Sequence, residues 1–143
     1  MTETSVINYK TALIYVMVVA AVADGELKES EAKIIAELAN TLPVFCGYDH
    51  HKVNIVTGDC ATLLNQDDGI DTVVGLIKQA LPKPLYETAY ALACDIIAAD
   101  GTAHQAELRW LSLLQNELHI SALHAAAIER GSRARYMRLM EEY

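Results

Sequence analysis

Four carboxylates stand at matching places in two segments of this chain. Residues 20–31 read AAVADGELKESE and residues 96–107 read IIAADGTAHQAE, so a shift of 76 residues superimposes both Ala-Asp-Gly tripeptides and one glutamate. The four acidic residues are Asp24, Glu31, Asp100 and Glu107. If the two segments pack against each other, their carboxylates offer oxygen ligands for a divalent cation, and Ca²⁺ or Mg²⁺ suits such a set better than Zn²⁺. These four residues are the predicted metal ligands, with Glu26 and Asp95 in reserve.

A structural role is the alternative for the same residues. An aspartate beside a glycine that ends a helix can accept hydrogen bonds from backbone amides of the next helix. A glutamate in a first helical turn is favoured by the helix dipole. An EF-hand does not fit, because Gly25 follows Asp24 directly, whereas an EF-hand loop places alternating oxygen ligands before its glycine. The residue types therefore leave a cation site and a capping role both open.

His104 adds a nitrogen to the second segment. It lies four residues after Asp100 and three before Glu107, so one helix face would present an imidazole together with a carboxylate. Such a pair suits a transition metal, although a solvated histidine at a helix start is the simpler interpretation. The other four histidines have no zinc-helix spacing, and no H-E-x-x-H occurs.

Motifs for enzymatic chemistry are nearly absent from the sequence. There is no G-x-S-x-G, no phosphate-binding P-loop and no G-x-G-x-x-G. Only 6% of the residues are aromatic, which does not favour a sugar-binding cleft. The sequence therefore predicts a protein that is not an enzyme; metal-dependent hydrolysis with Glu31 or Glu107 as the base is a remote alternative.

Helices must position these residues. An apolar run precedes each Ala-Asp-Gly and a leucine-rich helical pattern follows it, while no period-two strand pattern is found. We predict a single all-α domain over residues 1–143, with seven or eight helices in a compact bundle and two pseudo-symmetric helix–turn–helix halves at about 9–40 and 85–118. The expected helices are 5–24, 28–40, 49–65, 70–81, 84–99, one from a Thr102–Gln105 capping box to Leu118, 121–130, and a last short helix between Gly131 and Tyr143.

Composition limits the partners and the compartment. The net charge of −8 disfavours nucleic acid and anionic membranes, although Arg130, Arg133, Arg135 and Arg138 cluster near the end, where a solvated helix face is expected. The longest apolar run is about a dozen residues, too short to span a bilayer. No signal peptide opens the chain, and the three cysteines, expected to be buried, lack metal or disulfide spacing, so we expect a cytoplasmic protein.

With its doubled Ala-Asp-Gly and the glutamate seven residues after each aspartate, the chain resembles the tellurite-resistance TerB-like family. The resemblance extends over roughly residues 9–120. The family's fold is also found in the N-terminal region of DjlA-type co-chaperones. It implies a compact helical bundle, a bacterial stress-response role, metal binding through acidic residues, and other stress-response proteins as partners. The second segment has Thr102, His104 and Gln105 where the first has Glu26, Lys28 and Glu29, a departure that argues against two equal metal sites. A metal-free protein–protein interaction module, like the co-chaperone region, is the alternative function.

Overall fold

The computed structural model describes residues 6–23, 25–101 and 104–139, and within them every regular element is a helix. The seven α-helices are α1 (Tyr9–Val22), α2 (Glu29–Thr41), α3 (Val53–Leu64), α4 (Gly69–Ala80), α5 (Tyr86–Asp100), α6 (Gln105–Glu117) and α7 (Ala122–Arg135). Three 3₁₀ turns, Pro43–Phe45, His50–Lys52 and Lys83–Leu85, join some of them. The predicted all-α class is confirmed.

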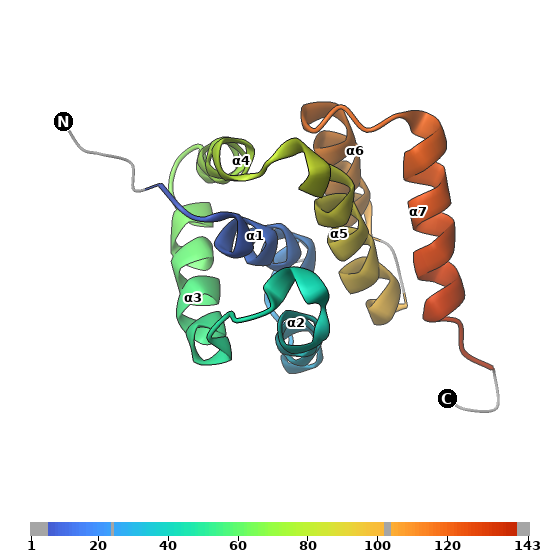
Figure 1. The fold of residues 1–143 in the computed structure, drawn as a ribbon, viewed down its shortest axis with the longest axis horizontal. Coiled ribbons are helices and arrows are strands. Elements are labelled where there is room, and N and C mark those ends of the chain that lie inside the picture. Colours follow the sequence, from blue (N-terminus) through green and yellow to red (C-terminus); the bar gives the residue numbers. More distant parts are fainter. Residues whose placement is uncertain (1–5, 24, 102–103, 140–143) are drawn as a thin grey trace.

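Helix α1 is the centre of the bundle (Figure 1). Every residue from 12 to 21 is buried, because α2, α3, α4, α5 and α6 all pack around this helix. A helix that is apolar on all sides can be stable in water only when neighbours enclose it, and the run of alanine, valine, leucine and isoleucine provides such a surface. Helix α5 is buried over much of its length in the same way and packs directly on α1.

The helices that follow the two turns correspond closely. Helix α2 runs from 29 to 41 and α6 from 105 to 117, so both ends agree under the 76-residue shift. The turns agree as well, because the Gly25 N–H donates to the Val22 carbonyl at 2.9 Å and the Gly101 N–H donates to the Ala98 carbonyl at 3.1 Å. Both glycines have positive φ, +126° and +88°, a conformation that a side chain would strain. The repeated sequence therefore gives repeated local structure.

The end of the chain differs from the expectation. Gly131 was expected to end a helix at Arg130, but α7 continues through it to Arg135. Glycine weakens a helix without forbidding it, and here the next turn is fixed by side-chain contacts to α5. The expected final short helix is wrong for Met137–Leu139, which are not helical; residues 140–143 lie outside the described part.

Helix α7 is the outermost helix and packs mainly along α5 (Figure 1). Polar contacts hold its second half. Asp95 of α5 accepts hydrogen bonds from the Ser132 hydroxyl and from Arg135 Nη2, each at 2.6 Å, and the Tyr90 hydroxyl donates a short hydrogen bond to Glu129. The arginine cluster is thus not only a solvated face, because Arg135 forms an ion pair with a nearly buried carboxylate.

Among the described residues, no helix has both the length and the apolar character that crossing a bilayer would require.

Candidate metal centre

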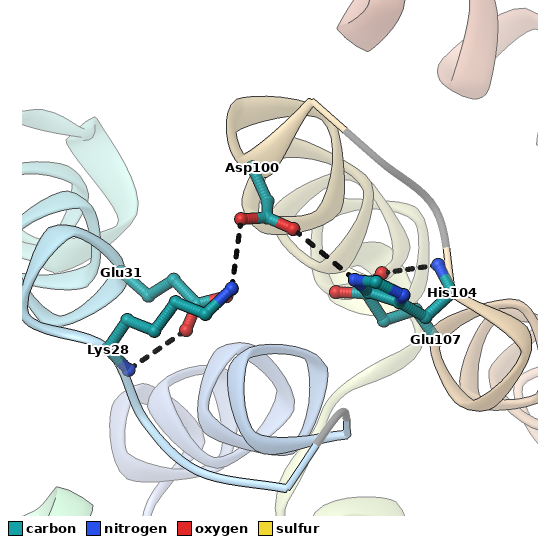
Figure 2. Close-up of polar contacts among 5 residues, drawn as sticks. All are labelled: Lys28, Glu31, Asp100, His104 and Glu107. Carbon is teal, nitrogen blue, oxygen red and sulfur yellow. Dashed lines mark hydrogen bonds and ion pairs between the residues drawn. The ribbon is translucent and has the colours of Figure 1, made fainter.

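Asp100 lies where the two repeated segments meet. It is the last residue of α5, and the left-handed Gly101 then turns the chain toward α6. Its side chain is only 12% exposed. The carboxylate points from the end of α5 toward the beginnings of α2 and α6, which belong to different halves of the sequence (Figure 2).

Glu31 and Glu107 occupy the same position in α2 and α6, the third residue of the helix. Each is almost completely buried, with 2% and 0% of its surface exposed. The Lys28 N–H donates to Glu31 Oε1 at 3.0 Å, and the His104 N–H donates to Glu107 Oε1 at 2.8 Å. Each glutamate therefore satisfies an amide that the helix start leaves unpaired. The sequence predicted only that the helix dipole favours these glutamates, and the structure adds a hydrogen bond from each N-cap amide.

The capping box at the N-terminus of α6 is not the predicted Thr102–Gln105 box. The helix begins at Gln105 with His104 as its N-cap, and the third helical residue is Glu107. Thr102 lies outside the described residues, and the capping box that the structure shows pairs His104 with Glu107. The sequence therefore predicted correctly that a capping box starts α6. The residue whose side chain bonds the N-cap amide is Glu107, however, and not Gln105.

Nitrogen-bearing side chains from both halves approach Asp100 (Figure 2). Lys28 Nζ lies 3.6 Å from Asp100 Oδ1, and His104 Nε2 lies 3.9 Å from Asp100 Oδ2. Lys28 and His104 are equivalent under the 76-residue shift, since each is the N-cap of its helix. One carboxylate is therefore held between the N-caps of the two repeats.

Asp100, His104 and Glu107 can each direct one ligand atom into a common space, and those three atoms lie within 4.8 Å of one another. A metal with bonds of 2.0–2.2 Å needs ligand atoms about 3.3–3.6 Å apart. Atoms at the full 4.8 Å separation must therefore approach by roughly 1.2–1.5 Å. The His104 side chain, 47% exposed, has the most freedom of the three to move. The arrangement provides one nitrogen and two oxygen ligands and leaves a side open to solvent.

The four predicted ligands are not all brought together. Asp100 and Glu107 belong to the three-residue group, whereas Glu31 comes from α2 in the other half and is not part of it (Figure 2). Asp24 lies outside the described residues. Of the reserve ligands, Asp95 is engaged by Ser132 and Arg135, and Glu26 is exposed.

The sequence pointed to His104 only weakly and did not point to Lys28. The spacing of His104 from Asp100 and Glu107 marked it as a secondary candidate, and this spacing is the signal that the structure supports. Lys28 carries a signal too, because the repeat aligns it with His104, but a lysine repels a cation and is not a ligand type.

The buried thiols are not part of the three-residue group. Cys60 and Cys94 are buried as expected, whereas Cys46 is exposed. Burial raises the pKa of each buried thiol to about 12, so both stay protonated and are poor nucleophiles at neutral pH.

Comparison with known proteins adds no relative: no protein-family model, curated protein or solved structure matches the chain.

Proposed function

We propose that this protein is a non-enzymatic, TerB-like stress-response module that binds one divalent cation at Asp100, His104 and Glu107. The convergence of three ligand atoms within 4.8 Å carries the proposal. The matching bounds of α2 and α6 and the matching glycine turns support two pseudo-symmetric halves, with the cation in the second half only. We also propose a cytoplasmic location and other stress-response proteins as partners, both from the family resemblance and the acidic composition.

The imidazole changes which ion the proposal favours. A set with one nitrogen and two carboxylate oxygens suits Zn²⁺ or Mn²⁺ better than the Ca²⁺ or Mg²⁺ expected from four carboxylates. The Lys28 ammonium beside Asp100 opposes any cation there and makes binding weaker than in an all-acidic site. The open side of the group leaves room for water or for a ligand atom from a partner.

Thermal unfolding of chelator-treated protein tests the proposal. At a concentration about 100 times its dissociation constant, a cation that binds only the folded state adds roughly 2.7 kcal/mol to the free energy of unfolding. For a domain of this size, that gain raises the midpoint by several degrees. We expect the rise with Zn²⁺ or Mn²⁺, a smaller one with Ca²⁺ or Mg²⁺, and its loss in Asp100→Asn and in Glu107→Gln.

Glu37→Gln is the matched control, because Glu37 is an exposed carboxylate on α2 outside the group. It should keep the full cation response. Calorimetric titration of the same variants with metal alone separates binding from folding, since Asp100→Asn has to fold and yet give no heat. An unchanged midpoint with all four ions, or an equal response in Asp100→Asn, would refute the cation site.

A metal-free interaction module remains the second candidate, and the surface of α7 favours it. Leu123 is 75% exposed and Met137, just after the helix, is 73% exposed. A partner that covered these two side chains would remove their apolar surface from water, which favours binding. In that case Asp100→Asn leaves partner capture intact, whereas Leu123→Asp abolishes it.

A further inference from the structure

One hollow of the bundle lies next to the Gly25 turn, and none of the three residues of the metal group lines it. Its floor is the last turn of α1, at Val19 and Val22, and its walls come from the C-terminal end of α3, Ile70 of α4 and one face of α6. Trp110 of α6 lines it. The volume is about 610 Å³, which falls within the range of pockets that bind small molecules.

The lining is apolar except at a few points. Three polar side chains reach it, Asn65 from the end of α3, Glu26 from the turn and Arg109 from α6. A pocket with mostly apolar walls and a few polar groups is typical of a site for an amphipathic ligand. The apolar walls would cover a hydrocarbon body, and the polar groups would fix one end of it.

Arg109 indicates the charge of that end. Its guanidinium is exposed and forms no ion pair or hydrogen bond with any residue in the described part of the chain. A guanidinium pairs with a carboxylate through two parallel hydrogen bonds. Glu26 adds one negative charge to the same lining, so a ligand with a single negative charge is favoured over a phosphate with two.

From this volume, apolar lining and single cation, we propose that the pocket binds an aliphatic monocarboxylate of fatty-acid type, with its chain against Val22, Leu64 and Trp110 and its carboxylate on Arg109. The site is separate from the proposed cation site, since none of Asp100, His104 and Glu107 lines it. Its test is therefore independent of the cation.

Trp110 is the only tryptophan of the chain, and it lines the pocket, so its fluorescence reports occupancy directly. The full-length protein is titrated with decanoate below its micelle concentration. Decanol, which has the same chain length and no charge, is titrated in parallel. We expect a saturable change in Trp110 emission with decanoate and binding about tenfold or more weaker with decanol, because the charged hydrogen bonds are lost.

Two variants locate the ligand. Arg109→Gln removes the charge from an exposed position, so it should weaken the binding of decanoate about tenfold and leave the binding of decanol unchanged. Arg130 is also exposed but lies outside the pocket, so Arg130→Gln should leave the binding of both compounds unchanged. Ala106→Phe fills the pocket and should abolish binding of both, with circular dichroism confirming that it folds. The proposal is overturned if decanoate gives no saturable change, if decanoate and decanol bind equally, or if Ala106→Phe still binds decanoate.

Discussion

At the scale of single residues, the buried polar groups of this protein fall into two kinds. Glu31 and Glu107 cap the N-terminal ends of their own helices, whereas Asp95 joins α5 to α7 through residues that lie 37 and 40 positions further along the chain. The first kind acts over three residues and can be recognised in the sequence. The second depends on the arrangement of α7 along α5, and nothing near Asp95 in the sequence announces Ser132 or Arg135.

Asp95 gives the first prediction. Asp95→Ala should lower the free energy of unfolding by about 2 kcal/mol, because it removes two hydrogen bonds to a charged group and leaves the buried Ser132 hydroxyl without its acceptor. Arg135 is 57% exposed, so water weakens its share. Urea unfolding measures the loss. Glu87→Gln breaks the exposed pair with His124 and should cost less than about 0.5 kcal/mol; equal losses in the two variants would contradict this account.

The buried thiols give a prediction about pH. The folded-state pKa of Cys60 is raised from 9.0 to about 12 by burial, so its contribution to stability is complete below pH 9 and is lost as pH rises toward 12. Above pH 9 the unfolded chain releases a proton that the folded chain keeps. The free energy of unfolding therefore falls, by up to about 1.4 kcal/mol per pH unit for this thiol.

The measurement is urea unfolding between pH 8.5 and pH 9.5, where tyrosines of the unfolded chain, with an ordinary pKa of about 10, are still mostly protonated. Cys60→Ala should reduce the slope of stability against pH, whatever its effect on stability at pH 7. Cys46→Ala changes an exposed thiol and should keep the wild-type slope. A slope that is the same in Cys60→Ala as in the wild type would show that this thiol does not control alkaline unfolding.

At the scale of helices, the sequence predicted the elements wherever local chemistry decides them. Apolar periodicity and the helix-ending glycines and prolines predict the glycine turns after α1 and α5, the apolar α1 and the helix over 70–81. The structure confirms these elements within a few residues at their ends. Helix α1 begins at Tyr9 rather than Ser5 because the Asn8 side chain accepts from the Thr11 N–H at 2.8 Å. The predicted helix end before Gly131 is wrong, because the tertiary contacts of the following turn outweigh the low helix propensity of one glycine.

The same difference between local chemistry and tertiary packing explains what could be predicted of the candidate site. The glutamates and Asp100 were identifiable because the repeat displays them in the sequence. Which groups share one space depends on how α2, α5 and α6 pack, so the exclusion of Glu31 from the three-residue group could be learned only from the structure. The place of His104 in the site could be predicted only in part. Its spacing in the sequence brings it near Asp100, but the packing of the helices decides the distance between them.

Gly131 gives a prediction at this scale. Gly131→Ala should stabilise α7 by about 0.5–1 kcal/mol, because alanine loses less backbone entropy in a helix. A Cβ there would meet only Arg135 Nη1, at 3.6 Å, an ordinary contact. Thermal unfolding should show a higher midpoint. Gly69→Ala is the opposite control, since its Cβ would lie 2.4 Å from the Leu63 carbonyl oxygen and should destabilise the protein. A lower midpoint in Gly131→Ala would mean that the backbone at that point is not truly helical.

At the scale of the whole molecule, Lys28 makes the two halves electrostatically dependent on each other. Its ammonium belongs to the turn before α2, and it pairs with the carboxylate at the end of α5. A cation held by Asp100, His104 and Glu107 would lie within about 6 Å of that ammonium, where like charges cost roughly 1 kcal/mol even in a watery environment. The first half would therefore reduce the cation affinity of the second.

This dependence has a measurable consequence. Lys28→Met keeps the length of the side chain and removes its charge, so it should tighten binding of Mn²⁺ or Zn²⁺ about threefold to tenfold in a calorimetric titration. Lys78→Met is the matched control, because Lys78 pairs with Glu117 at 2.9 Å on another surface and should leave the affinity unchanged. The gain in Lys28→Met should shrink as salt is raised, since screening weakens the repulsion that the substitution removes. Weaker binding in Lys28→Met would instead mean that the lysine holds Asp100 in the geometry that the cation needs, and that the two halves cooperate rather than compete.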